Sequence, residues 1–105
     1  MLIVETPIFT KRVQLGLDEE QYRLLQSAIV ASPEIGRVIP GGGGIRKLRW
    51  TGSGRGKRGG ARVIYRWFPD QDKVLMLFVF LKNEMADLTR PQLKQLRDVA
   101  ESELR

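Results

Sequence analysis

Residues 46–66, RKLRWTGSGRGKRGGARVIYR, concentrate side chains that can bind phosphate. No Asp or Glu occurs between Glu34 and Asp70, although acids and bases usually intersperse on a surface because like charges repel at short range. Positive charge left uncompensated is most simply explained by a polyanion that compensates it. The stretch therefore indicates a nucleic-acid-binding surface. Its cations are Arg46, Lys47, Arg49, Arg55, Lys57, Arg58, Arg62 and Arg66.

Such cations suit one phosphoryl reaction in particular. Lysine and arginine stay protonated near neutral pH unless they are desolvated, so they act first as electrostatic clamps. In RNA the ribose 2′-hydroxyl can attack the adjacent phosphate, so the substrate supplies the nucleophile. The protein then has to align the hydroxyl, stabilise charge on the phosphorane and transfer two protons. A lysine or a tyrosine in a cationic field can act as the base, and no metal is required.

Composition excludes several other kinds of chemistry. The chain of 105 residues has no cysteine and no histidine, which removes disulfides, thiolate nucleophiles and the commonest metal ligand and general base. We expect no cofactor. The first residues resemble no signal peptide, and no apolar run is long enough to span a bilayer, so we expect a cytoplasmic protein with no membrane partner. The length predicts one domain over residues 1–105.

The cations lie in two predicted strands, residues 45–50 and 61–68, with a glycine-rich loop between them. Cationic and apolar residues alternate in both strands, so the cations are expected to share one face of a sheet while apolar residues fill the other. Tyr65 is ambiguous: its hydroxyl either faces the cationic side or satisfies a buried acceptor. The loop matches a G-x-G-x-x-G pattern from Gly54 to Gly59, but a strand follows it where a dinucleotide site needs a helix.

The remaining pattern predicts an α+β domain. The fully apolar residues 74–81 are typical of a central strand covered on both faces, and Thr89 and Asp18 are good helix N-caps. We expect a three-stranded antiparallel meander with the helices packed on one face. The other predicted elements are an edge strand at residues 2–5, a short helix at 9–15, a helix from Asp18 to Ser32, a loop at 35–44, a turn at 69–72 and a helix after Thr89.

Three ordered blocks resemble the RelE/HigB superfamily of bacterial toxin–antitoxin modules, particularly its HigB-like branch. The blocks are GGIRKLRW, GKRGGARVIYRWF and VLMLFVFLKNEMADLTRPQLKQL. The resemblance covers residues 1–100 and implies a small ribonuclease-type fold, in which an N-terminal strand and a helical pair pack on a twisted antiparallel sheet with a C-terminal helix. It also implies cleavage of messenger RNA in the ribosomal A site. The implied partners are the ribosome, the messenger RNA and an antitoxin, which we expect to carry a helix-turn-helix DNA-binding domain.

The resemblance assigns catalytic roles to Lys47, Arg49, Arg62 and Lys82. It and the charge pattern together assign RNA contacts to Arg46, Lys57, Arg58, Tyr65 and Arg66. This chain departs from many relatives at Phe80, where they carry a tyrosine, and its final helix contains no aromatic residue. The identity of the general base is therefore open.

Two other functions remain open at this point. The missing tyrosines are consistent with a catalytically inactive protein of the same fold that binds RNA, the ribosome or an antitoxin. The basic face would also suit an adaptor that binds an acidic protein segment.

Overall fold

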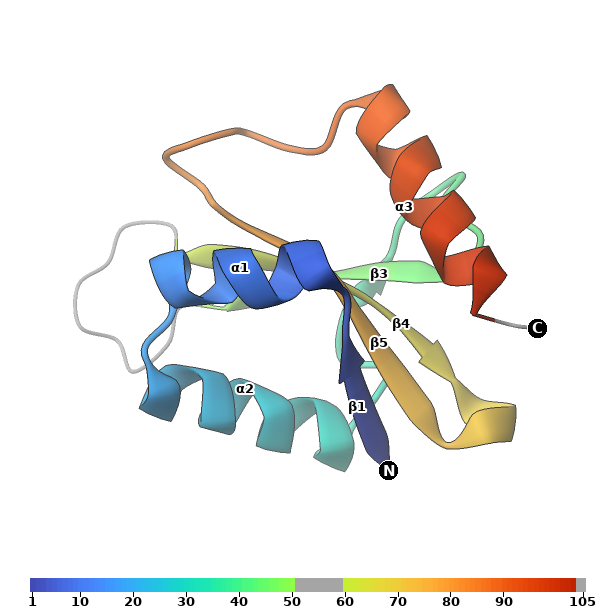
Figure 1. The fold of residues 1–105 in the computed structure, drawn as a ribbon, viewed down its shortest axis with the longest axis horizontal. Coiled ribbons are helices and arrows are strands. Elements are labelled where there is room, and N and C mark those ends of the chain that lie inside the picture. The colour runs from blue at the N-terminus through green and yellow to red at the C-terminus, as the bar shows by residue number, and fades with distance from the viewer. Residues whose placement is uncertain (51–59, 104–105) are drawn as a thin grey trace.

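A computed structural model describes residues 1–50 and 60–103 of the chain. One five-stranded sheet with strand order β1-β5-β4-β3-β2 forms its centre (Figure 1). The strands are β1 (Leu2–Glu5), β2 (Arg37–Val38), β3 (Ile45–Trp50), β4 (Ala61–Phe68) and β5 (Lys73–Leu81), and the helices are α1 (Pro7–Gly16), α2 (Glu19–Ala31) and α3 (Arg90–Ser102). A single 3₁₀ turn, Pro69–Gln71, joins β4 to β5.

The sheet is mixed: the expected antiparallel strands are present, and the edge strand β1 adds one parallel pairing. Strands β2 to β5 pair antiparallel, whereas β1 lies parallel to β5 at the edge. The predicted meander, edge strand and central strand are all confirmed. The loop expected at residues 35–44 contains the short strand β2, which pairs with the start of β3.

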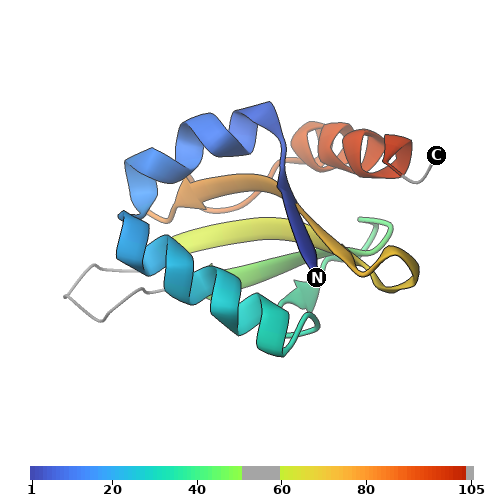
Figure 2. The ribbon, with the colours of Figure 1, turned by 60° about the horizontal axis from the view of Figure 1, so that its bottom comes forward.

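The helices cover both faces of the sheet, so the expectation that they share one face is wrong. In Figure 2 α2 and α3 lie on opposite sides of the strands. One core lies between the sheet and the first two helices and includes Phe9, Leu25 and Val63; the other includes Ile64, Leu75 and Ala100 of α3. Because β5 is apolar on both sides, each of its faces needs a cover, and α3 provides the second one.

A β-bulge in β5 adjusts these two faces. Ile64 of β4 pairs with Phe78 and Tyr65 pairs with Met76, which leaves Leu77 as the extra residue on β5. A bulge of this kind reverses which side chains face which side of the sheet beyond it. The Leu77 carbonyl accepts a hydrogen bond from Thr6 Oγ1 at 3.0 Å, and the same hydroxyl oxygen accepts from Phe9 N to cap α1. The bulge is thus joined to the start of the helical pair.

Candidate nucleic-acid interface

Four cations from β3 and β4 lie on the sheet face that α3 only partly covers. Arg49 is directly opposite Arg62, Lys47 is opposite Ile64, and Arg66 is opposite Ile45. Directly opposed residues point to the same side of a sheet, and Ile45 and Ile64 belong to the core under α3. The alternating residues Leu48 and Val63 lie in the core under α1 and α2 instead. We call the residues Lys47, Arg49, Arg62 and Arg66 the cationic face.

Arg62 is the most enclosed member of the cationic face. Only 8% of its surface is exposed, whereas Arg49 opposite it is exposed. On its other side Arg62 is opposite Phe80 of β5. A side chain this enclosed has few ways to move, so its charge is presented in one direction. The pair Arg49 and Arg62 is the densest positive charge that β3 and β4 bring together among the described residues.

Lys82 lies immediately beyond the end of β5. Its backbone N–H donates to the Gly60 carbonyl at 3.2 Å, so the ladder between β4 and β5 continues up to this residue. Lys82 follows Phe80, the partner of Arg62, by two positions and is the first residue of the turn after β5. The structure therefore places the Lys82 backbone at the edge of the cationic face, and its side chain is exposed.

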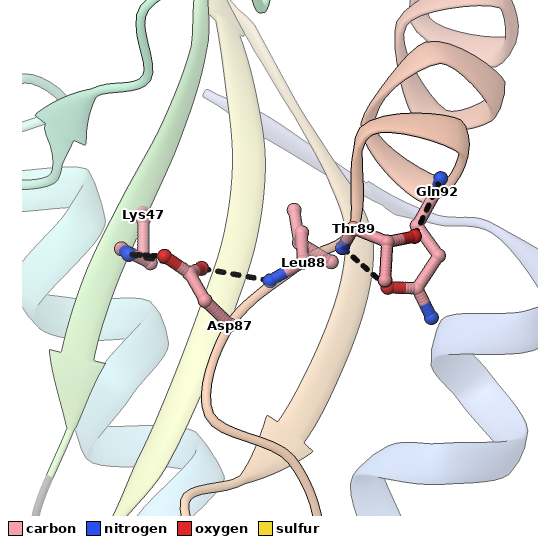
Figure 3. Close-up of polar contacts among 5 residues, drawn as sticks. All are labelled: Lys47, Asp87, Leu88, Thr89 and Gln92. Carbon is pink, nitrogen blue, oxygen red and sulfur yellow. Dashed lines mark hydrogen bonds and ion pairs between the residues drawn. The ribbon is translucent and has the colours of Figure 1, made fainter.

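The cationic face contains a carboxylate that the sequence did not reveal. Asp87 comes from the loop between β5 and α3, drawn in orange in Figure 1, and points toward Lys47 (Figure 3). Lys47 Nζ lies 3.1 Å from Asp87 Oδ1 and 3.0 Å from Oδ2, and Leu88 N donates to Oδ1 at 2.8 Å. Positive charge at Lys47 is thus compensated by an acid forty residues further along the chain. The only sequence signal was an Asp two positions before the N-cap Thr89, which any helix start can show.

Asp87 is ionised over the whole neutral range. Partial burial opposes ionisation, but the hydrogen bonds from Leu88 N and Lys47 and the charges of Lys47 and Arg62 outweigh it, so the pKa of the Asp87 carboxyl lies below its ordinary value. The contribution of Arg62 shows that Asp87 is within electrostatic reach of both basic strands. The Asp87 side chain is nevertheless 59% exposed and that of Lys47 26%, and ion pairs open to solvent contribute about 0–1 kcal/mol to stability.

Other contacts hold the loop in place around Asp87. Met85 and Leu88 pack against the core under α3. Glu84 accepts hydrogen bonds from Leu81 N and from Arg12 of α1, and these two interactions lower the pKa of the Glu84 carboxyl. Just beyond Asp87, Thr89 and Gln92 form a capping box that starts α3 (Figure 3). The loop is therefore fastened mainly by contacts other than the ion pair.

Two of the predicted RNA-contacting residues lie on the opposite side of the sheet. Tyr65 is 0% exposed; its hydroxyl donates to the Pro33 carbonyl at 2.8 Å and accepts from Gly36 N at 2.9 Å. Arg46 pairs with Tyr65 across the strands, and its guanidinium donates to the Gly36 carbonyl at 2.8 Å. A side chain without exposed surface cannot touch a bound strand, so Tyr65 satisfies buried acceptors and donors, and the expected RNA contact is corrected. Burial also raises the pKa of its hydroxyl above the ordinary value.

The remaining predicted residues are distributed as follows. Arg66 shares the cationic face but lies four residues beyond Arg62 along β4. Its guanidinium is 4.8 Å from the centre of the Phe68 ring. Gly44 packs closely against the same guanidinium, so Arg66 lies near the end of the sheet, close to the 40–44 loop. Lys57 and Arg58 lie outside the described residues.

The chain has a small α+β fold: two helices cover one face of the sheet, one helix covers part of the other, and the cations lie where that second face is open. Solved structures of E. coli RelE have a similar fold. The free E. coli toxin RelE, as a double arginine mutant, matches with a TM-score of 0.61 and 13% identity over 94% of this chain and 95% of that one. The crystal structure of isolated E. coli RelE in its P21 form gives a TM-score of 0.55 and 16% identity over 93% and 97%. RelE from the intact E. coli RelBE toxin–antitoxin complex gives 0.58 and 17% over 74% and 92%.

A family model described as the RelE toxin of the RelE/RelB toxin–antitoxin system matches residues 23–105. The chain belongs to the RelE family of toxins of toxin–antitoxin systems. The predicted superfamily is thereby confirmed, and placement in the HigB-like branch stays a prediction. No helix within residues 1–50 and 60–103 is long and apolar enough to cross a bilayer.

Proposed function

We propose that this protein is an endoribonuclease that cleaves messenger RNA in the ribosomal A site and so inhibits translation. The observation that carries the proposal is the placement of Arg49 directly opposite Arg62, with Lys47 beside them and Lys82 at the edge. Like charges at opposed positions of a sheet destabilise it, and an anion bound between them removes that cost. A phosphate of RNA is such an anion, and the E. coli relatives of the same fold are toxins of this family.

The proposed reaction is a transesterification within the RNA. The 2′-oxygen forms a bond to the adjacent phosphorus, the bond to the 5′-oxygen breaks, and the products are a 2′,3′-cyclic phosphate and a 5′-hydroxyl. Arg49 and Arg62 stabilise the charge of the phosphorane by donating hydrogen bonds from fixed positions. Lys47 and Lys82 orient the phosphate, and as ammonium groups either can protonate the leaving oxygen. The 2′-hydroxyl releases one proton and the leaving 5′-oxygen takes one up, so the reaction consumes no net proton.

The proposed partners follow from the family. E. coli RelE occurs in a toxin–antitoxin complex with RelB, and we propose that this chain, as one domain over residues 1–105, is held inactive in the cytoplasm by a cognate antitoxin with a helix-turn-helix DNA-binding domain. Arg66 extends the contact with RNA along β4, and Lys57 and Arg58 add contacts from the glycine-rich loop. No cofactor takes part.

One observation favours a second candidate, a catalytically inactive binder of RNA or the ribosome. Tyr65 is buried away from the cationic face, and Phe80 occupies the position at which many relatives carry a tyrosine. A cationic face without a tyrosine hydroxyl to take part in proton transfer from the 2′-hydroxyl would bind RNA without cleaving it.

Reconstituted translation with one defined messenger RNA distinguishes the two candidates. RNA 5′ ends are mapped after addition of the protein, with a ribosome-free reaction and the Arg62→Ala variant as controls. New ends at fixed codon positions, dependent on ribosomes and on Arg62, are the expected result. Cleavage in both reactions would mean a ribonuclease that acts on free RNA. Salt-sensitive binding without new ends would favour the inactive binder.

A further inference from the structure

We propose that Asp87 is an autoinhibitory residue: it occupies the phosphate-binding position beside Lys47 and Arg62 in the free protein, competes with RNA there, and so lowers the affinity of the cationic face for RNA. The inference rests on the proposed function, since it takes the cationic face to be where RNA binds. It goes beyond that function because it assigns a role to an acid that the reaction itself does not use.

The surroundings of Asp87 form an anion site that is already filled. Lys47 Nζ contacts both carboxylate oxygens at 3.1 and 3.0 Å, and the Leu88 backbone N–H donates to one of them at 2.8 Å (Figure 3). Two donors converging from a strand and a loop are the kind of contact that a phosphate oxygen also makes. The low pKa of the carboxyl, to which Arg62 contributes, means that the site holds a full negative charge at neutral pH.

The competitor is easy to displace. The Asp87 side chain is 59% exposed, and an ion pair this open to water adds little stability. Met85 and Leu88 anchor the loop in the core, and Glu84 bonds to Arg12, so the carboxylate can leave Lys47 by a change of side-chain rotamer while the loop stays in place. A phosphate can therefore replace Asp87 at Lys47 at a small cost in free energy.

That small cost lowers the affinity for every RNA by the same factor. A free strand also has to pay for ordering its own backbone, so its already weak occupancy of the cationic face falls further. A strand already ordered on the ribosome carries no such ordering cost, so its higher affinity keeps it bound despite the same penalty. Asp87 thereby lowers the affinity for RNA in general and leaves the ribosomal substrate accessible.

Binding of single-stranded RNA to the Asp87→Asn variant tests this inference. Asparagine keeps the shape and the acceptor for Leu88 N but removes the charge. A fluorescent RNA with 2′-O-methyl groups binds without being cut, because it lacks the attacking hydroxyl. Fluorescence anisotropy across a salt series is expected to show about two- to fivefold tighter binding than wild type at low salt, as an exposed pair allows. The slope of log K against log[salt] is expected to steepen by about 0.7, for one more phosphate contact.

Asp98→Asn is the matched control, since Asp98 also pairs with a lysine, at 3.6 Å from Lys94 Nζ, and is 63% exposed. Both variants change net charge equally, so a general charge effect would act on both. Tighter binding by Asp87→Asn alone, abolished when Lys47→Ala is added, supports the inference. Equal binding by the two variants, or weaker binding by Asp87→Asn in a protein with wild-type thermal unfolding, overturns it. Failure of wild type to cut messenger RNA on ribosomes would refute the proposed function and leave this comparison of affinities intact.

Discussion

At the scale of single residues, the cationic face is a set of unfavourable neighbours. Arg49 and Arg62 oppose each other on adjacent strands, where side chains lie about 4.5–5.5 Å apart at their Cβ atoms. Asp87 relieves part of this repulsion through Lys47 and through the field at Arg62. The stability of the face is thus linked to whichever anion occupies it, a carboxylate or a phosphate.

Replacing Tyr65 by phenylalanine is expected to affect stability and not RNA cleavage. The change leaves the buried Gly36 N–H and the partly buried Pro33 carbonyl without their partner, which costs about 1–3 kcal/mol. Urea unfolding measures the loss of stability, and cleavage per folded molecule is measured beside it. A large loss of cleavage at unchanged stability would contradict this and assign the Tyr65 hydroxyl a role in RNA cleavage.

Acid is expected to destabilise the protein partly through Asp87 and Glu84. Both carboxyl groups have pKa values below the ordinary ones, so their contribution is fully present above about pH 4 and is lost as the pH falls through the lower, folded-state pKa values. Thermal unfolding of wild type and of the Asp87→Asn, Glu84→Gln double variant is measured between about pH 3 and pH 7, a range that includes the unfolded-state carboxyl pKa of about 4. The variant should lose less stability on acidification; parallel curves would contradict the assignment.

The sequence predicted some of these residues and not others for a clear physical reason. Strand alternation correctly groups Lys47, Arg49 and Arg62 on one face, because period two is a local property. The same alternation places Arg46 on the other face, but the prediction that Arg46 contacts RNA took only its charge into account. Asp87 could not be predicted, since its contact with Lys47 depends on the path of a loop across the sheet.

At the scale of elements, caps and strand bounds follow from local sequence, whereas the covering of faces does not. The predicted strands Ile45–Trp50 and Ala61–Phe68 are confirmed residue for residue, as are the N-caps Asp18 and Thr89. The apolar β5 indicates that both of its faces are covered, but not which helix covers which face. The bulge at Leu77 was equally hidden, because a strand that is apolar throughout shows no change of phase.

The two capping boxes offer a matched test of how the helices start. Asp18 and Gln21 cap α2, and Thr89 and Gln92 cap α3, with reciprocal bonds in both. Alanine at Asp18 or at Thr89 is expected to lower the free energy of unfolding by about 1 kcal/mol in each case. Urea unfolding gives both values. A Thr89→Ala variant as stable as wild type would show that packing of α3, and not its cap, fixes the end of the loop that carries Asp87.

At the scale of the whole molecule, positive charge is concentrated in one part of the chain. Net charge is +6, and nine of the eighteen basic residues fall within residues 35–69, where no acid occurs. Four of these nine residues form the cationic face on the side of α3, whereas Arg46 lies on the other side of the sheet. A polyanion approaching this molecule is therefore drawn towards strands β3 and β4.

The most direct test of the account compares Arg49→Gln with Arg23→Gln. Each removes one exposed arginine and one positive charge, but Arg23 lies on α2, away from the cationic face. Single-turnover cleavage of messenger RNA in the A site of a reconstituted ribosome complex gives the rate constant of each variant. The account predicts that Arg49→Gln lowers it by about a hundredfold, as loss of a donor to the transition state does, while Arg23→Gln stays close to wild type. Equal rate constants for the two variants would contradict the claim that this face of the sheet performs the cleavage.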